Sequence, residues 1–140
     1  MSVYADTSFF VSLYIEDRHS KAADQLMASG SLVCFTPLHS AEWNHAIAQQ
    51  VFRGEMSPSE ANGVRSDLEA DLTSGLWAQA VFPENAFDLC ADLAKRYGSK
   101  LGVRTLDSLH VACALELKAE RFWTFDDRQA KLAKAEGLKI

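Results

Sequence analysis

The order of apolar and polar residues along the chain predicts short strands separated by helices. Five short stretches have the composition of strands, namely 3–5, 31–35, 76–82, 121–125 and 137–140. Seven longer stretches carry apolar residues at helical spacing or begin with a helix-start signal, namely 7–15, 19–28, 38–52, 57–74, 83–97, 105–117 and 126–136. Strands that alternate with helices predict a parallel sheet with helical crossovers, which is an α/β sandwich.

Local signals predict where one of these helices begins, where another ends and that a third is buried. Ser57-Pro58-Ser59-Glu60 combines a capping box with a proline in the first turn, so a helix should begin there. Gly98 should end the helix that precedes it, leaving a basic loop before Thr105. The helix over 105–117 is apolar on most faces, which predicts that it is buried all round.

Composition predicts one globular domain that spans 1–140. Of its residues, 48% are hydrophobic and 24% are charged. No apolar run has the length of a membrane span or the flanks of a signal peptide, and we expect a cytoplasmic protein without membrane contact. Cys34, Cys90 and Cys113 are far apart among apolar residues, which favours buried thiols over a metal or redox pair. The net charge of −5 lacks the footprint of a nucleic-acid binder, so a polyanion would need a local basic patch or bound cations.

Four acidic residues stand where a parallel sheet brings loops together. Asp6 and Asp126 directly follow predicted strands, Asp107 lies in the first turn of the buried helix, and Glu42 lies on a partly apolar stripe of its helix. Taken singly, an acid at such a position is often a helix cap or complements the helix dipole. Because the carboxyl ends of parallel strands meet at one edge of a sheet, the four together predict a shared pocket.

A pocket of four carboxylates predicts a bound metal ion. Like charges repel by up to about 4 kcal/mol for a close pair at an effective dielectric constant of about 20, and divalent cations remove that cost. Oxygen ligands without His or Cys select Mg²⁺, with Mn²⁺ as a substitute. Thr7 and Ser8, and Thr124 before Asp126, are expected to support the acids with their hydroxyls. Without metal, mutual repulsion should raise the pKa of at least one acid.

Several segments resemble the PIN domain. They are Val-Tyr-Ala-Asp-Thr-Ser-Phe-Phe at 3–10, Glu42 inside a helix, Arg-Thr-Leu-Asp-Ser-Leu-His-Val-Ala-Cys-Ala at 104–114 and Thr-Phe-Asp-Asp-Arg-Gln at 124–129. The spacing of the acids also suits the family, with 36 residues from Asp6 to Glu42, 65 more to Asp107 and 19 more to Asp126. The resemblance covers nearly the whole chain, although segment 55–80 carries no family pattern.

The resemblance implies a PIN-like α/β/α sandwich with a short, mostly parallel sheet. It implies a Mg²⁺-dependent endoribonuclease, most similar to the VapC-type toxins of toxin–antitoxin pairs. Asp6, Glu42, Asp107 and Asp126 match the family's acidic quartet, which binds the metal and catalyses the hydrolysis. Metal-activated water would leave 5′-phosphate and 3′-hydroxyl ends.

Partners follow from the same resemblance. The substrate is RNA, a small antitoxin protein is expected, and a homodimer is expected because similar proteins pair through their helices. Lys100 and Arg104, in a basic cluster just before Asp107, are expected to bind RNA phosphates. Lys131 and Lys134 are expected to be plain surface.

Aromatic side chains and histidines are assigned more ordinary roles. Trp43 and Trp77, together with Phe52 and Phe82, could supply apolar area to a homodimer. The histidines His39, His45 and His110 are expected to make hydrogen bonds in the core or on the surface rather than to bind metal.

Other functions stay open at this point. A housekeeping RNA-processing nuclease or a non-catalytic RNA-binding module would keep the same fold. A phosphoryl-accepting receiver domain also places acids and Mg²⁺ at strand ends, but it needs an acidic pair after its first strand. Here that strand ends in the single acid Asp6.

Overall fold

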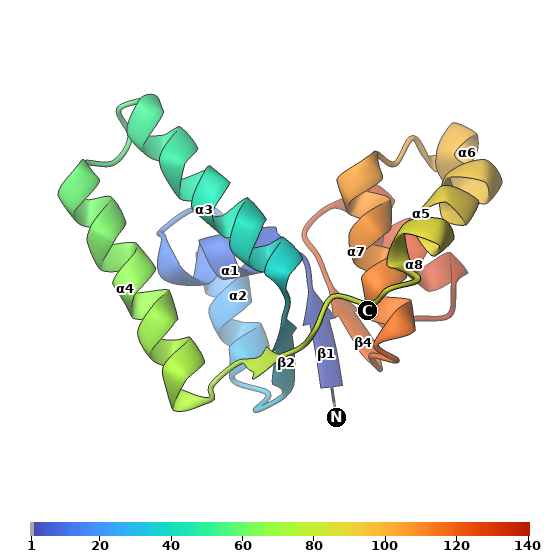
Figure 1. Ribbon diagram of the computed structural model, residues 1–140, viewed down its shortest axis with the longest axis horizontal. Helices are drawn as coiled ribbons and strands as arrows, with labels where there is room; N and C mark the ends of the chain where they lie inside the picture. The colour runs from blue at the N-terminus through green and yellow to red at the C-terminus, as the bar shows by residue number, and fades with distance from the viewer. Residues whose placement is uncertain (1) are drawn as a thin grey trace.

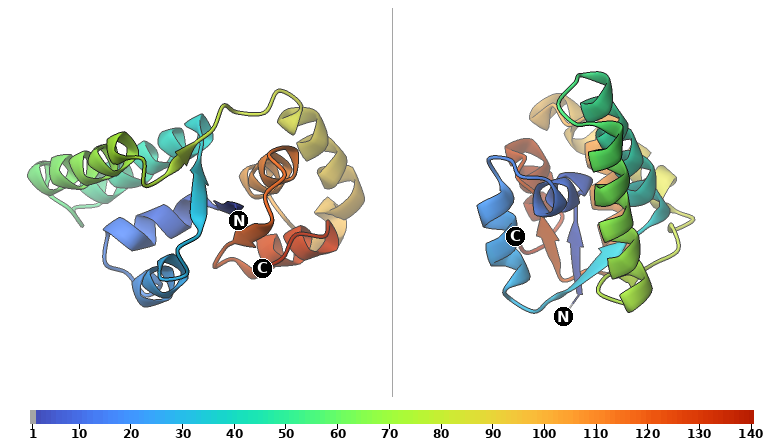
Figure 2. Two further views of the ribbon diagram at one scale, coloured as in Figure 1. Left: turned by 90° about the horizontal axis from the view of Figure 1, so that it is seen from below. Right: turned by 90° about the vertical axis from the view of Figure 1, so that its left-hand side faces the viewer.

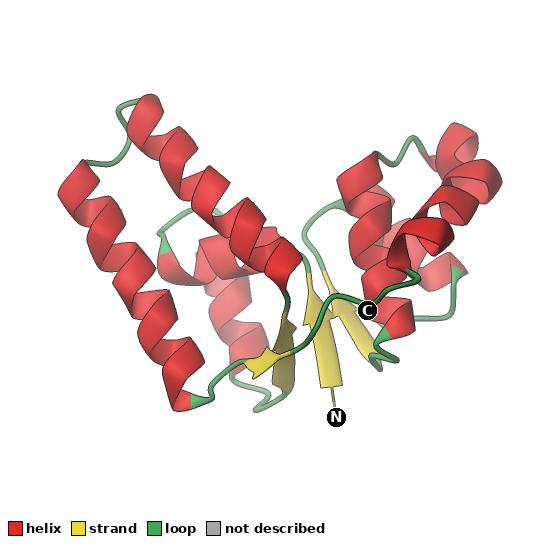
Figure 3. Cartoon of the chain, viewed as in Figure 1, coloured by secondary structure: helices red, strands yellow, loops and turns green. Residues whose placement is uncertain are grey.

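The computed structural model describes residues 2–140, and its centre is a four-stranded parallel sheet. The strands are β1 Ser2–Ala5, β2 Leu32–Phe35, β3 Ala78–Gln79 and β4 Arg121–Trp123, in the spatial order β3-β2-β1-β4. Val3 of β1 pairs with Val33 of β2 on one side and with Arg121 of β4 on the other. The central strand is buried on both faces, as parallel strands usually are, and its residues Val3 to Ala5 are all 0% exposed. The predicted parallel sheet is therefore confirmed (Figure 3).

Helices cover both faces of the sheet. In chain order they are α1 Thr7–Tyr14, α2 Ser20–Met27, α3 Pro37–Phe52, α4 Pro58–Ser74, α5 Ala86–Leu93, the π-helical turn η1 Ala94–Gly98, α6 Ser99–Leu101, α7 Thr105–Glu116 and α8 Asp127–Ala135. Figures 1 and 2 show α1 to α4 on one side of the sheet and α5 to α8 on the other. This arrangement confirms the α/β/α sandwich.

Successive side chains of β1 enter two separate cores. Val3 and Ala5 pack with the aromatic residues of α1, α3 and the segment before β3, whereas Tyr4 packs with α5, α7 and α8. Trp43 and Trp77 are each 2% exposed inside the first core. They cannot supply a dimer surface, so that part of the prediction is wrong, because both indole rings are needed to fill the space between helices and sheet.

The local signals predict the start of α4 correctly but not the end of the helix before Gly98. Ser57 and Glu60 form the predicted reciprocal cap, with Glu60 N donating to Ser57 Oγ at 3.0 Å and Ser57 N donating to Glu60 Oε1 at 3.2 Å. Gly98 does not end its helix, because it adopts an ordinary helical conformation, and the chain continues through α6 to Gly102 at φ +67°. Glycine tolerates that left-handed conformation, and the helical stretch ends there. Residues Ser99–Leu101 of the expected basic loop are therefore helical.

Four predicted strands are shorter than expected: 31–35 begins at Leu32, 121–125 ends at Trp123, and the other two keep little of their length. The stretch 76–82 keeps only Ala78–Gln79 as a strand, and the helix predicted from Pro83 begins at Ala86. Pro83 lacks the backbone N–H that a longer strand would use. The terminal stretch 137–140 is reduced to one parallel bridge between Arg121 and Lys139. Within residues 2–140, no helix combines the length and the hydropathy that a membrane crossing requires.

Candidate active site

Asp6 lies at the carboxyl end of β1, where three neighbours hold its side chain. Ser8 Oγ donates to Asp6 Oδ1 at 2.6 Å, and Phe9 N donates to the same oxygen at 3.3 Å. On the other side, Thr124 Oγ1, just after β4, lies 3.0 Å from Asp6 Oδ2. The carboxylate is only 8% exposed, and it caps α1. Asp6 is thus both the helix cap that its position suggests and a buried acid held from two strands.

Burial dominates the ionisation of Asp6. Removal from water raises the pKa of this carboxyl, and the opposing hydrogen bonds from Ser8 and Thr124 only partly offset that effect. The sequence predicts a raised pKa for at least one of the four acids, which Asp6 confirms. The expected cause is wrong, because the rise comes from burial and not from the repulsion of neighbouring carboxylates.

Glu42 projects from α3 toward α1 and α7. Thr7 Oγ1 donates to Glu42 Oε1 at 2.7 Å, and His110 Nε2 hydrogen bonds to the same oxygen. Burial opposes the ionisation of Glu42, but the hydrogen bonds from His110 and Thr7 outweigh it and hold the pKa of Glu42 below its ordinary value. Thr7 supports Glu42 rather than Asp6, the acid beside it in the chain.

The other two acids lie at helix starts. Asp107, half-buried in the first turn of α7, accepts a hydrogen bond from Arg104 N at 3.4 Å through Oδ2. Asp126 is exposed and caps α8, where Gln129 N donates to Asp126 Oδ1 at 2.8 Å. Asp6 and Glu42 are therefore anchored by side chains from distant segments, whereas the carboxylates of Asp107 and Asp126 bond to nearby backbone.

Gln129 connects these elements, and sequence reasoning did not select it. Its side chain is fully buried, accepts from Thr124 Oγ1 at 2.6 Å and donates through Nε2 to the backbone oxygen of Asp107 at 3.1 Å. It therefore ties the loop after β4 to the first turn of α7. Its only signal in the sequence is a position one turn after Asp126, where a glutamine is commonplace.

A hard divalent cation suits the chemistry of this donor set. The four acids offer only carboxylate oxygens, with hydroxyls beside them, which is the ligand type that Mg²⁺ and Mn²⁺ prefer. Within residues 2–140, however, no three His, Cys, Asp or Glu side chains come close enough together to hold one metal ion. Mg²⁺ usually keeps several waters and takes one or two protein carboxylates directly, so the chemistry of this donor set fits such an ion without a cluster of three protein ligands.

Sequence comparison decides the family. Residues 3–135 match the PIN domain, which is nearly the entire chain. The chain belongs to the PIN domain family. No curated protein matches its sequence.

Three solved structures share the fold of this PIN domain. VapC20 from Mycobacterium tuberculosis, described as a toxin that cleaves the sarcin–ricin loop, is 16% identical at a TM-score of 0.69, over 97% of this chain and 95% of its own. VapBC2 from Rickettsia felis, bound to a DNA fragment from its promoter, is 14% identical at a TM-score of 0.67, over 99% and 96%. FitAcB from Neisseria gonorrhoeae is 15% identical at a TM-score of 0.69, over 94% of this chain and 93% of its own. At such identities the likeness establishes the fold alone.

The basic residues between α5 and α7 differ in whether they form ion pairs with acidic side chains. Lys100 on α6 and Arg104 just before α7 are both exposed. Arg96, in the same stretch, is engaged by Asp92 at 3.0 Å and Glu136 at 2.9 Å. Unlike Arg96, Lys100 and Arg104 form no ion pair within residues 2–140.

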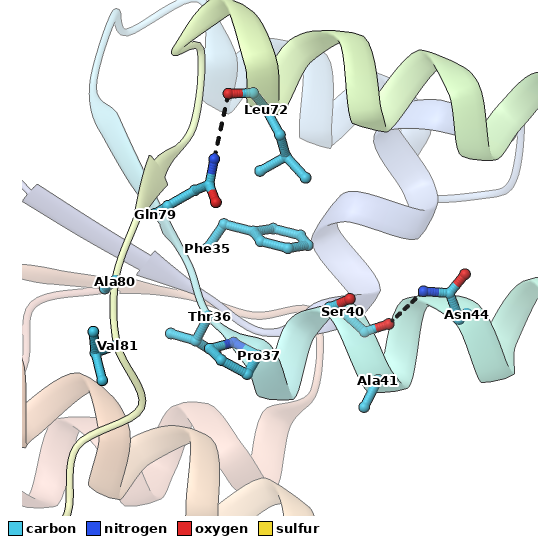
Figure 4. Close-up of a pocket in the computed structure, with 10 residues that line it drawn as sticks. All are labelled: Phe35, Thr36, Pro37, Ser40, Ala41, Asn44, Leu72, Gln79, Ala80 and Val81. Carbon is cyan, nitrogen blue, oxygen red and sulfur yellow. Dashed lines mark hydrogen bonds between the residues drawn. The ribbon is translucent and has the colours of Figure 1, made fainter.

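Two cavities flank α3. One, of about 300 Å³, has Glu42 as the one candidate acid in its lining, together with Thr7, Ser8, Val11, Ser12, Asp17, His19 and Ala46. The other, of about 700 Å³, lies between the start of α3, the end of α4 and the segment after β3 (Figure 4). The larger cavity contains none of the four acids and is lined mostly by apolar atoms. Only the smaller one belongs to the candidate site.

Proposed function

We propose that this PIN domain is a Mg²⁺-dependent endoribonuclease, with Mn²⁺ able to substitute, and the toxin of a toxin–antitoxin pair. The observation that carries the proposal is a pair of partly desolvated acids, Asp6 at the end of β1 and Glu42 on α3, which are linked because Thr7, next to Asp6, donates to Glu42. Within residues 2–140, neither Asp6 nor Glu42 forms an ion pair with a lysine or arginine. Partly buried carboxylates that lack a lysine or arginine partner are groups that a divalent cation stabilises.

Each acid has a role in holding that cation. Asp6 and Glu42 supply the central oxygens, and Asp107 and Asp126 supply further negative charge from the first turns of α7 and α8. When bound, the cation lowers the pKa of a water molecule and stabilises charge on the phosphate. Ser8 and Thr124 orient the Asp6 carboxylate, and Thr7 orients Glu42.

Neither Ser108 nor His110, which stand beside Asp107 on α7, is free to act as a side-chain nucleophile. Ser108 is 2% exposed in the interior of α7, and His110 is engaged with Tyr4 and Glu42. Water is therefore the nucleophile, and hydrolysis leaves 5′-phosphate and 3′-hydroxyl ends. Lys100 and Arg104 bind the phosphates of RNA that flank the cleaved bond.

The assignment as a toxin rests on the fold. The structures that it resembles include a toxin that cleaves the sarcin–ricin loop and the VapBC2 complex on promoter DNA. On this basis we propose an RNA substrate, a small antitoxin partner and a homodimer. A housekeeping RNA-processing nuclease is the second candidate, since the same acids would serve it.

RNA cleavage by the purified protein tests the proposal. End-labelled RNA should be cut with Mg²⁺ or Mn²⁺, left intact with EDTA, and cut at least about 100-fold more slowly by Asp6→Asn or Glu42→Gln, a loss typical of an essential electrostatic group. Glu69→Gln, on the exposed side of α4, is the matched control and should cleave like the wild type. Equal cleavage by Asp6→Asn and the wild type would exclude the metal-nuclease mechanism.

A further inference from the structure

A buried hydrogen-bond chain runs from the core of the sheet to Glu42. His110 on α7 is 3% exposed, and its two ring nitrogens face opposite partners. Nδ1 lies 2.7 Å from the hydroxyl of Tyr4 on β1, and Nε2 bonds to Glu42 Oε1. Both nitrogens of the imidazole are thus used within the protein.

The direction of this chain follows from the hydrogens available. The carboxylate of Glu42 can only accept, so His110 Nε2 must carry a hydrogen, and the buried Tyr4 hydroxyl, 2.7 Å from Nδ1, can donate to the other nitrogen. If the imidazole is neutral, Tyr4 donates to Nδ1 and the ring hydrogen sits on Nε2. If it is charged, both nitrogens carry hydrogens. In either state an N–H points at Glu42.

Two donors converge on the same carboxylate oxygen. Thr7 Oγ1 donates to Glu42 Oε1 at 2.7 Å and lies 3.3 Å from His110 Nε2. The hydrogen bonds that Glu42 accepts from residues 2–140 therefore end on Oε1. This leaves Oε2 as the oxygen that can turn to a cation.

We propose that His110 and Tyr4 are positioning residues that hold Glu42 by Oε1, present its other oxygen to the divalent cation and thereby set the affinity for that cation. The inference rests on the proposed metal-dependent function and extends it to residues that touch neither metal nor RNA. Such outer partners of a ligating group typically change metal affinity by about 10–100-fold. Because Tyr4 and His110 belong to β1 and α7, the anchor is part of the packed core.

Mn²⁺ binding, followed by the electron paramagnetic resonance signal of the free ion, tests this without RNA. His110→Leu removes the donor at similar volume and should weaken Mn²⁺ binding by about 10–100-fold. His110→Gln places an amide N–H near the position of Nε2 and should recover most of that loss. Thermal melts of each variant establish that it is folded at the temperature of the titration.

A pair of tyrosine variants provides the matched control. Tyr4→Phe removes only the hydroxyl behind His110 and should weaken Mn²⁺ binding in the same direction as His110→Leu, by less. Tyr14→Phe removes a hydroxyl that is also hydrogen bonded, to Trp77 Nε1 at 2.8 Å and to Asp71, away from the site. Tyr14→Phe should leave Mn²⁺ affinity unchanged.

The possible results separate the inference from the function on which it rests. Wild-type affinity in His110→Leu would overturn the inference alone, and so would a His110→Gln variant as weak as His110→Leu, since packing would then explain the loss. Equal losses in Tyr4→Phe and Tyr14→Phe would overturn it as a general effect of destabilisation. A wild-type protein that binds no Mn²⁺ would overturn the proposed function, and the inference with it.

Discussion

The hydroxyl of Thr124 lies 3.0 Å from Oδ2 of Asp6, although 118 residues separate the two in the chain. The same hydroxyl lies 2.6 Å from Oε1 of Gln129, whose amide nitrogen is committed to the backbone oxygen of Asp107. Thr124 has one hydrogen for these two oxygens. A proton or a cation at Asp6 Oδ2 resolves the shortage, which agrees with the raised pKa of Asp6.

Asp6→Asn should stabilise the metal-free protein at neutral pH. The new amide can donate to Thr124 Oγ1, so that Thr124 donates to Gln129, and the cost of burying a charge disappears. Removing one unsatisfied buried group should raise the free energy of unfolding by about 1 kcal/mol or more. The loss of the charge at the start of α1 should lower it by up to about 1 kcal/mol, through the helix dipole. Urea unfolding in EDTA measures it. A variant less stable than the wild type would mean that Asp6 acts chiefly as a cap.

The pH dependence of stability should carry the signature of Asp6. Because its pKa is higher in the native state than the ordinary 3.8, the native state binds more protons than the unfolded state above that pH. The contribution of Asp6 to the free energy of unfolding is therefore greatest at low pH and is lost as pH rises through the native pKa. The Asp6→Asn variant should not lose this contribution to the free energy of unfolding as pH rises. Unfolding curves from pH 4 upward in EDTA should converge at the acid end and separate toward neutrality; parallel curves would contradict the assignment.

His39 should produce the opposite dependence. It is fully buried, with Nδ1 accepting from Thr36 N at 3.0 Å and Nε2 donating to Ala5 O at 2.7 Å, and burial lowers its pKa to about 3. The unfolded state binds the extra proton between about pH 3 and the ordinary 6.5, so stability falls as pH decreases through that range. His39→Gln should flatten this slope. The exposed His45, on the same helix, supplies the control His45→Gln.

Charge reversal of Lys100 and Arg104 should weaken RNA binding. For a single strand, each phosphate that the protein no longer neutralises reduces the steepness of log affinity against log salt by about 0.7. The double variant Lys100→Glu, Arg104→Glu should show a flatter slope, measured by fluorescence anisotropy with a catalytically inactive Asp6→Asn background. Lys131→Glu, Lys134→Glu on α8 has the same charge change. If both double variants behave alike, net charge rather than local phosphate binding explains the effect.

Exposed apolar residues locate the surface for the proposed homodimer. With Trp43 and Trp77 buried, the large exposed side chains include Val81 at 86% and Phe87 at 64%, around the start of α5. Val81→Glu, Phe87→Glu should convert a dimer to a monomer in light scattering at tens of micromolar. Phe52, also 86% exposed but at the far end of α3, is the other exposed residue that the sequence predicts for a dimer surface, and Phe52→Glu tests it separately. A wild-type monomer at that concentration, without a partner, would contradict the homodimer.

Local patterns predicted most elements of the fold because their causes are local. Ser57 and Glu60 cap α4 through contacts within one turn, and the apolar sequence of α7 is matched by burial from Ser108 to Ala114. The ends of elements were harder to predict. Gly98 and Gly102 lie four positions apart, and only Gly102 adopts the left-handed conformation that ends the helix. Nothing in the local sequence distinguishes the two glycines.

The candidate site was predictable as a set of acids but not as a network. Asp6 and Glu42 follow from strand ends and helical spacing, whereas their anchors depend on partners far along the chain. His110 meets Glu42 across 68 residues, and no feature of its own helix distinguishes it from a core histidine. Hydrogen-bond partners of this kind depend on tertiary packing, which periodicity does not encode.

The pairing of β1 with β4 also sets when the site can exist during synthesis. A ribosome that has released the chain as far as Glu116 has delivered Asp6, Glu42 and Asp107, yet one edge of β1 still lacks its partner strand, Arg121 to Trp123. Thr124 and Gln129 follow only after that strand. A nascent chain, or a fragment that stops before β4, therefore has three of the four acids, without Asp126 and without the strand and side chains that hold Asp6. In a protein proposed to cut RNA, the active site would therefore form only after translation has passed β4 and Gln129.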